Sequence, residues 1–175
     1  MYFLAHQSIV QILIVLVSVL LALVHALPLE RRAENINIKV TSSSQFCSYL
    51  PPSPGEEIAH AEGSAVPFCT SKQASGTRQF PSGFITSAHF KSTSTYSQVT
   101  GRIDRTRYQL SSSDEGGQYD NKNEIGGTCN GWSHWVNLVE PSDNIFCIRC
   151  CKNSSDCNLG RSEYGCQSIV PGDYS

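Results

Sequence analysis

The sequence has few charged residues and no strong excess of either sign. Charged side chains make up 16% of the 175 residues, and the formal net charge is −2. Without a field of one sign, little in the chain would attract nucleic acid or an anionic membrane, so neither is an expected partner. No long stretch places apolar residues at helical spacing, and no internal repeat is present. A helical bundle and a solenoid are therefore excluded.

The chain has a single long apolar run, which lies at residues 9–24. It is followed by Val24-His25-Ala26, which matches a signal-peptidase site with cleavage after Ala26. The run also approaches the roughly 18–20 residues that span a bilayer, so an uncleaved anchor is the alternative. With no second apolar span and no apolar tail, we expect residues 1–26 to be a signal peptide. The mature protein is then expected to be secreted, extracellular and not attached to a membrane.

A dibasic pair, Arg31-Arg32, follows the signal segment. It is either a cleavage site for a secretory-pathway protease, which makes residues 27–32 a propeptide, or an exposed basic pair that is never cut. Removal of residues 1–32 leaves 143 residues with a net charge of −3. That length predicts one domain, 33–175, with room for a real core.

All eight cysteines lie in the mature region, and six of them fall between residues 129 and 166. Cys147 and Cys150 form a CxxC pair with two cysteines downstream, which raises the alternative of a zinc site, but Cys151 interrupts that pattern. Secretion into an oxidising compartment favours disulfides instead. We therefore predict disulfides and no metal or other cofactor, with the cysteines at Cys47, Cys69, Cys129, Cys147, Cys150, Cys151, Cys157 and Cys166.

Cys47 and Cys69 stand apart from the other cysteines, so we expect them to pair with each other. The remaining six allow fifteen pairings, among which the sequence does not choose. Adjacent Cys150 and Cys151 lie in a predicted strand and must point to opposite faces, so they should serve two different bridges.

The mature chain is predicted to be all-β, a disulfide-stabilised sandwich or small barrel with long loops. Alternation indicates a first hairpin from 83–91 and 96–104, with 84, 86, 88 and 90 on one face and 85, 87, 89 and 91 on the other. A second hairpin, 132–139 with 145–151, carries the densest apolar cluster and is the expected core nucleus. Further short strands are expected at 36–40, 107–110 and 167–170, one or two helical turns at 56–62, and a loop over 111–127.

Four carboxylates are candidates for enzyme chemistry. They are Asp104 and the cluster Asp114, Glu115 and Asp120 in a glycine-rich segment. Two carboxylates facing one groove could hydrolyse a glycosidic bond. Acidic residues in such a segment are more often solvated turn formers, so we assign no catalytic residue.

The sequence does not match the other catalytic and metal-binding motifs. The segment from Asp120 resembles a calcium loop, but Lys122 occupies a position that needs an oxygen ligand. His60, His89 and His134 are the histidines of the mature chain, and no GxSxG elbow accompanies them. We expect these histidines to be ordinary sheet or surface residues.

Asn153-Ser154-Ser155 is an N-x-S sequon, so Asn153 is a predicted N-glycosylation site once the chain is secreted. Serine and threonine clusters at 41–44, 93–97 and 111–113 are candidates for O-linked sugar.

Several motifs together resemble one family over residues 47–175, the secreted fungal glycoproteins described as immunoreactive mannoprotein or macrophage-activating glycoprotein. The matching pieces are Cys47-Ser-Tyr-Leu-Pro-Pro, Pro81-Ser-Gly-Phe, Ser87-Ala-His-Phe90, Gln98-Val-Thr-Gly-Arg102, Asp114-Glu-Gly-Gly-Gln-Tyr-Asp120, Cys147-Ile-Arg-Cys-Cys151 and Gly172-Asp-Tyr-Ser175. Members of that family continue into a mannosylated Ser/Thr-rich tail with a surface anchor. This sequence stops at the last motif, so free secretion is expected. The resemblance implies no catalytic residue.

The leading hypothesis is a non-enzymatic secreted fungal glycoprotein of the cell surface or host interface, either effector-like or immunoreactive. The alternative is a small carbohydrate-active enzyme that uses the loop carboxylates. The expected partner is a wall glycan or a host protein, and the domain is expected to be a monomer.

Overall fold

The computed structural model describes residues 36–122, 125–160 and 164–175. The predicted signal peptide and propeptide therefore lie outside the described residues. The elements in the described part are β1 (Asn37–Ile38), β2 (Val40–Ser42), β3 (Gln45–Leu50), η2 (Ala59–Ala61), β4 (Val66–Cys69), β5 (Arg78–Gln79), β6 (Ile85–Ser92), β7 (Tyr96–Ile103), η3 (Arg105–Tyr108), β8 (Gly117–Asp120), β9 (Thr128–Cys129), β10 (His134–Glu140), β11 (Ile145–Cys151), η4 (Ser154–Cys157) and α2 (Gly165–Ile169).

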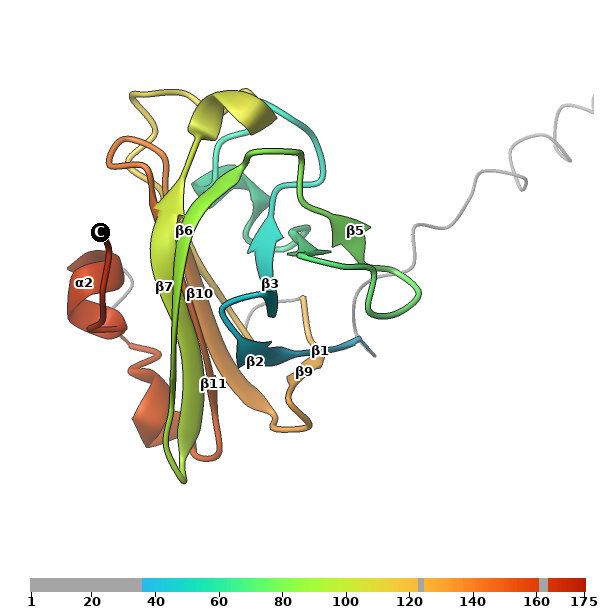
Figure 1. Cartoon of the computed structure of the whole chain (residues 1–175), viewed down its shortest axis with the longest axis vertical. Coiled ribbons are helices and arrows are strands. Elements are labelled where there is room, and N and C mark those ends of the chain that lie inside the picture. Colours follow the sequence, from blue (N-terminus) through green and yellow to red (C-terminus); the bar gives the residue numbers. More distant parts are fainter. Residues whose placement is uncertain (1–35, 123–124, 161–163) are drawn as a thin grey trace, which may run out of the picture. The chain divides into compact units, whose positions relative to one another are not determined.

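Two open sheets and a short parallel pair, β1 with β9, contain these strands. One is antiparallel with the order β6-β7-β11-β10-β8, and the other has the order β2-β3-β4-β5. In Figure 1, β2, β3 and β5 lie on one side of β7, β10 and β11, and α2 lies on the other. The prediction of a disulfide-stabilised all-β fold is confirmed, and the sheets stay open rather than closing into a barrel.

Both predicted hairpins are present, because the alternation that defines each lies within one short segment. β11 has the predicted bounds, and it pairs with β10 on one side and β7 on the other. Its seven residues are all buried, since both faces of the strand are covered. Phe146, Ile148 and Cys150 enter the core between the sheets, whereas Ile145, Cys147 and Cys151 enter a second apolar cluster beneath η4 and α2.

A β-bulge in β6 changes which side chains of that strand share a face. The register with β7 shifts between Ile85 and Ser87, so Ile85 packs against the core while Ser87 and His89 keep the opposite face. The prediction that Ile85 shares a face with His89 was wrong, because a bulge inserts one residue and reverses the alternation. Gly101 of β7 pairs with Ala88, next to the bulge, and a Cβ at Gly101 would lie 2.1 Å from the Ser87 carbonyl oxygen.

Aromatic contacts and one amide join the two sheets. Phe46 of β3 stacks on Phe146 at 5.6 Å between ring centroids, and Tyr49 stacks on Trp135 at 4.4 Å. The fully buried Asn137 carboxamide accepts from Tyr49 N–H at 3.0 Å and donates to Tyr49 C=O at 3.2 Å. Asn137 therefore occupies the edge of β3 as the peptide group of another strand would.

The four disulfides are Cys47–Cys69, Cys129–Cys150, Cys147–Cys166 and Cys151–Cys157. Cys47 and Cys69 form the pair expected from their isolation in the sequence, directly opposite each other on β3 and β4. Cys150 and Cys151 serve different bridges on opposite faces of β11, as their adjacency predicts. The bridges to Cys166 and Cys157 hold α2 and η4 against the second apolar cluster.

Three local predictions were wrong. Residues 105–108 form the 3-10 turn η3, capped by the Asp104 side chain, rather than a strand at 107–110. Within the expected loop 111–127, residues 117–120 pair with β10 as β8. Residues 165–169 are helix α2 instead of a strand, because Cys166 and Ile169 are spaced to share one buried helical face.

Candidate functional site

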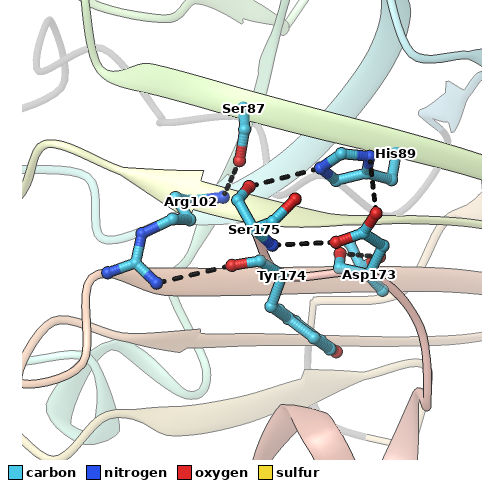
Figure 2. A network of polar contacts seen from close by, with 7 residues as sticks. Ser87, His89, Arg102, Asp173, Tyr174 and Ser175 are labelled. Atoms are coloured by element: carbon cyan, nitrogen blue, oxygen red, sulfur yellow. Dashed lines mark hydrogen bonds and ion pairs between the residues drawn. The ribbon is translucent and has the colours of Figure 1, made fainter.

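The last five residues of the sequence lie along the outer face of β6 and β7 (Figure 2). Three β7 side chains at alternate positions donate to main-chain carbonyl oxygens of this segment. Gln98 donates to Pro171 at 3.0 Å, Thr100 to Asp173 at 2.7 Å and Arg102 to Tyr174 at 3.4 Å. We call residues 171–175 the strap and this face of β6 and β7 the strap site.

A buried arginine holds the first of these donors in position. Arg149 donates from Nε and Nη2 to Oε1 of Gln98, at 2.9 and 2.7 Å. Because Oε1 is occupied in this way, the amide nitrogen of Gln98 is directed at the strap. Arg149 itself lies 4.4 Å from the centre of the Tyr96 ring and donates to the Asp156 carbonyl. Its burial lowers the pKa of the guanidinium.

Little room separates the strap from β7. A Cβ on Gly172 would lie 2.7 Å from Oγ1 and 2.8 Å from Cγ2 of Thr100. Gln98 and Thr100 are each 1% exposed, although both are polar. The tyrosine of the strap, Tyr174, packs against the second apolar cluster and donates its hydroxyl to the Val170 carbonyl at 2.7 Å. Burial raises the pKa of that hydroxyl.

His89 lies between a carboxylate and a serine but does not form a nucleophilic triad. Its Nδ1 is 3.4 Å from the Asp173 carboxylate, and its Nε2 is 3.3 Å from the main-chain oxygen of Ser175. A triad requires Nε2 to contact the nucleophilic hydroxyl. The nearby Ser87 hydroxyl instead accepts from the main-chain N–H of Arg102 at 3.1 Å. Figure 2 shows both contacts of the imidazole. The arrangement binds main chain and activates no nucleophile.

The strap also carries its own stabilised carboxylate. The pKa of Asp173 is lowered first by hydrogen bonds from the main-chain N–H and the hydroxyl of Ser175, and then by the charge of His89. Asp173 is therefore ionised over the ordinary pH range and ready to pair with a protonated histidine.

The carboxylates considered for catalysis have different surroundings and, in the described part of the chain, share no hydrogen-bond partner. Asp104 caps η3, accepting from Thr106, whose hydrogen bond is the main reason that its pKa is lowered. Asp114 accepts from the main-chain N–H groups of Ile58 and Gly116. Asp120 is 3% exposed and accepts from Gln118 and Lys122, while Glu115 is exposed.

The remaining histidines do not build a metal site within the described residues. His60 is exposed and 3.3 Å from Glu57, and His134 lies on β10. Among residues 36–122, 125–160 and 164–175, no group of three His, Cys, Asp or Glu side chains could hold a metal ion. The cysteines proposed as alternative zinc ligands are all paired in disulfides.

Asn153 is exposed and begins η4, inside the loop closed by the Cys151–Cys157 bridge. Its side-chain amide donates to Asp156 at 3.2 Å. The site is open to solvent, as a glycan would require, and N-glycosylation there stays a prediction.

The sequence pattern did not indicate Arg149, Gln98 or Thr100 as members of a site. The available signal was the alternation of hydrogen-bond donors at 98, 100 and 102 along one strand face. Only the folded chain shows what these donors contact.

The fold and the strap site define a disulfide-stabilised all-β domain with one sheet face occupied by its own chain. The sequence is similar to "Appressorium protein ROW1" of Mycosarcoma maydis, 33% identical over 156 residues, which cover 77% of this chain and 36% of that protein. It is also similar to "Appressorium protein ROW2" of the same fungus, 30% identical over 139 residues, covering 70% of this chain and 47% of that protein. The chain thus spans between about a third and a half of these curated relatives.

Similarity to fungal proteins is therefore confirmed, whereas neither of these names refers to mannoproteins. No protein-family model matches the sequence, and no solved structure does. In the part of the chain that the structure describes, every helix is too short or too polar to cross a bilayer.

Proposed function

We propose that this chain is a non-enzymatic, extracellular domain of a fungal protein that acts at the surface of the infection structure, where fungus and host meet. The observation that carries the proposal is the similarity to two appressorium proteins over 70–77% of the chain. Four disulfides support an extracellular location, because such bonds persist in oxidising compartments.

The chemistry of the described residues supports binding rather than catalysis. The histidine nearest to a carboxylate and a serine directs Nε2 to a main-chain oxygen. The candidate acids Asp104, Asp114 and Asp120 are engaged in turns and caps. The proposed partners are wall glycans or host surface proteins, and the proposed modification is an N-glycan at Asn153. Membership of the immunoreactive mannoprotein group, suggested by the motifs, belongs to the same proposal.

The location is tested by expressing the full chain in a fungus that forms appressoria and detecting it with an antibody raised against the folded domain. The expected result is label at the outer surface of appressoria and protein in the culture medium. The matched control is the chain without residues 1–26, which should stay inside the cell. Retention of the full chain inside the cell would contradict the proposal.

The glycan is tested with two asparagine variants. Asn153→Gln should migrate faster on a gel and become insensitive to an N-glycosidase, whereas Asn158→Gln should behave like the unmodified chain. Asn158 is the matched control because it is also exposed but lies outside a sequon. Equal mobility of all three proteins would show that Asn153 is not modified.

The absence of catalysis is tested by incubating the purified chain with chitin, β-glucan and mannan and measuring released reducing ends. We expect no release above a heat-denatured control and saturable binding to at least one polymer or host-surface preparation. Release that disappears in Asp114→Asn or Asp120→Asn would overturn the non-enzymatic proposal.

A further inference from the structure

The strap site contacts peptide main chain more than it contacts side chains. Three donors of β7 reach carbonyl oxygens of residues 171, 173 and 174, and His89 reaches the main-chain oxygen of Ser175. Hydrogen bonds to main chain supply affinity for any extended peptide, and pockets for individual side chains supply selectivity.

Selectivity arises at three positions of the strap. Residue 172 must be glycine, because a Cβ would clash with Thr100. Residue 173 carries the carboxylate that lies 3.4 Å from His89, and residue 174 supplies a tyrosine ring to the second apolar cluster. Together these contacts define a recognised sequence, Gly-Asp-Tyr, within an extended segment.

One of the donors, Gln98, is held by contacts that do not involve the strap. Gln98 is oriented by two hydrogen bonds from Arg149, which the Tyr96 ring and the Asp156 carbonyl fix in turn. None of these supporting residues belongs to the strap. A site organised in advance loses less conformational entropy when a peptide binds.

One of the two contacts of His89 depends on the charge of the ring. Nδ1 faces the Asp173 carboxylate and Nε2 faces the main-chain oxygen of Ser175. The contact with Asp173 is an ion pair, which is attractive only when the ring carries a positive charge, whereas the Nε2 hydrogen bond needs only one N–H. Histidine changes charge between about pH 5 and 8, so the hold on the strap should be stronger at acidic pH.

The charged neighbours of His89 fit this charge state only in part. On β6, Ser87 and Lys91 share its face, and on β7 Thr100 lies directly opposite, with Arg102 beside it. The two cations carry the same charge as a protonated ring. Asp173 carries the opposite charge, and it is present only when the strap, or a peptide like it, is seated.

We propose that the outer face of β6 and β7 is a binding site for an extended peptide containing Gly-Asp-Tyr. In this chain the site is filled in cis by residues 171–175, and such a peptide binds it in trans when the strap is displaced, more tightly below neutral pH. The inference goes beyond the proposed function and does not rest on it, since peptide binding can fail while the chain is still a surface protein.

The test uses the full chain with the strap unseated. Gly172→Val cannot seat residue 172 against Thr100, and Gly160→Val is the matched control because a Cβ at Gly160 meets nothing within 4 Å. The probe is a dye-labelled, end-blocked peptide, Val-Pro-Gly-Asp-Tyr-Ser, followed by fluorescence anisotropy. Both variants are first checked for four intact disulfides. If Gly172→Val does not fold, Tyr174→Gly unseats the strap without altering β7.

The expected result is saturable binding to the Gly172→Val chain, at least tenfold tighter than to the Gly160→Val chain, in which the tethered strap competes at millimolar effective concentration. The same peptide with valine in place of glycine should not bind. Binding should be about two- to fivefold tighter at pH 5.5 than at pH 7.5, as for an exposed ion pair. The Gly172→Val, His89→Gln chain should lose that difference.

Three results would overturn the inference. They are no saturable binding to the unseated chain at pH 5.5, equal binding to both glycine variants, and equal binding of the valine-containing peptide. Binding that is unchanged between the two pH values, or that keeps its pH dependence without His89, would refute the role of the histidine.

Discussion

Replacing Asn137 by leucine is expected to destabilise the domain strongly, although the two side chains are similar in size. Asn137 is fully buried, and its carboxamide accepts from Ser48 Oγ at 2.6 Å as well as pairing with the main chain of Tyr49. The partner of Tyr49 in β4 is Pro67, which has no N–H to donate. The Tyr49 carbonyl therefore has no donor opposite it in β4, and the N–H and C=O of Tyr49 are both bonded to the Asn137 side chain instead.

The magnitude follows from the groups that leucine would leave buried without partners. These are the N–H and C=O of Tyr49 and the hydroxyl of Ser48, each costing about 1–3 kcal/mol. The added apolar burial offsets about 1–2 kcal/mol. A net loss of about 1–8 kcal/mol is expected, out of the roughly 5–15 kcal/mol that stabilise a typical domain. Ser48→Ala, which removes one of the three hydrogen bonds, should cost only about 0.5–1.5 kcal/mol.

The assay is guanidinium unfolding with the disulfides intact, followed by tryptophan fluorescence. Trp135 is a suitable reporter because it stacks on Tyr49 at 4.4 Å. The midpoint should fall in Asn137→Leu with little change in the slope of the unfolding free energy. If Asn137→Leu unfolds within about 0.5 kcal/mol of the unmodified chain, the carboxamide does not take the place of a strand beside Tyr49.

Three further perturbations follow from the same structure. Gly101→Ala should cost about 1–3 kcal/mol in thermal or chemical unfolding, because its Cβ would lie 2.1 Å from the Ser87 carbonyl oxygen. Burial raises the pKa of Glu140, so above about pH 4 the folded state binds more protons than the unfolded state. The free energy of unfolding should therefore fall as the pH rises through the raised pKa. Glu140→Gln should remove that fall. Replacing both Cys151 and Cys157 by alanine opens a bridge of sequence separation 6 and should cost about 2 kcal/mol.

Each perturbation has a contrary outcome. Wild-type stability of Gly101→Ala would mean that β6 pairs without its bulge. If the stability of Glu140→Gln still falls with rising pH, a group other than Glu140 causes the pH dependence. An alanine pair at 151 and 157 that leaves stability unchanged would show that η4 is held by apolar packing alone.

Local patterns in the sequence were enough to predict the hairpins and the opposite directions of Cys150 and Cys151. These features depend on alternation with a period of two, which is set within a strand and needs no knowledge of the rest of the fold. The same logic failed at Ile85, where one inserted residue reverses the alternation. It also failed at α2, whose short buried face is recognisable only once β10 and β11 are in place beneath it.

The sequence by itself determined the class of the domain: an all-β chain with paired cysteines and no coherent catalytic motif. Tertiary structure alone decided which polar side chains form a site. Thr100 meets the main chain of Asp173 across 73 residues of sequence, and Asn137 meets Tyr49 across 88. Such contacts depend on the packing of the sheets and on the disulfide connectivity. Neither can be read from the local periodicity of the sequence. The strap site is therefore a property of the fold, assembled from residues that are unremarkable one by one.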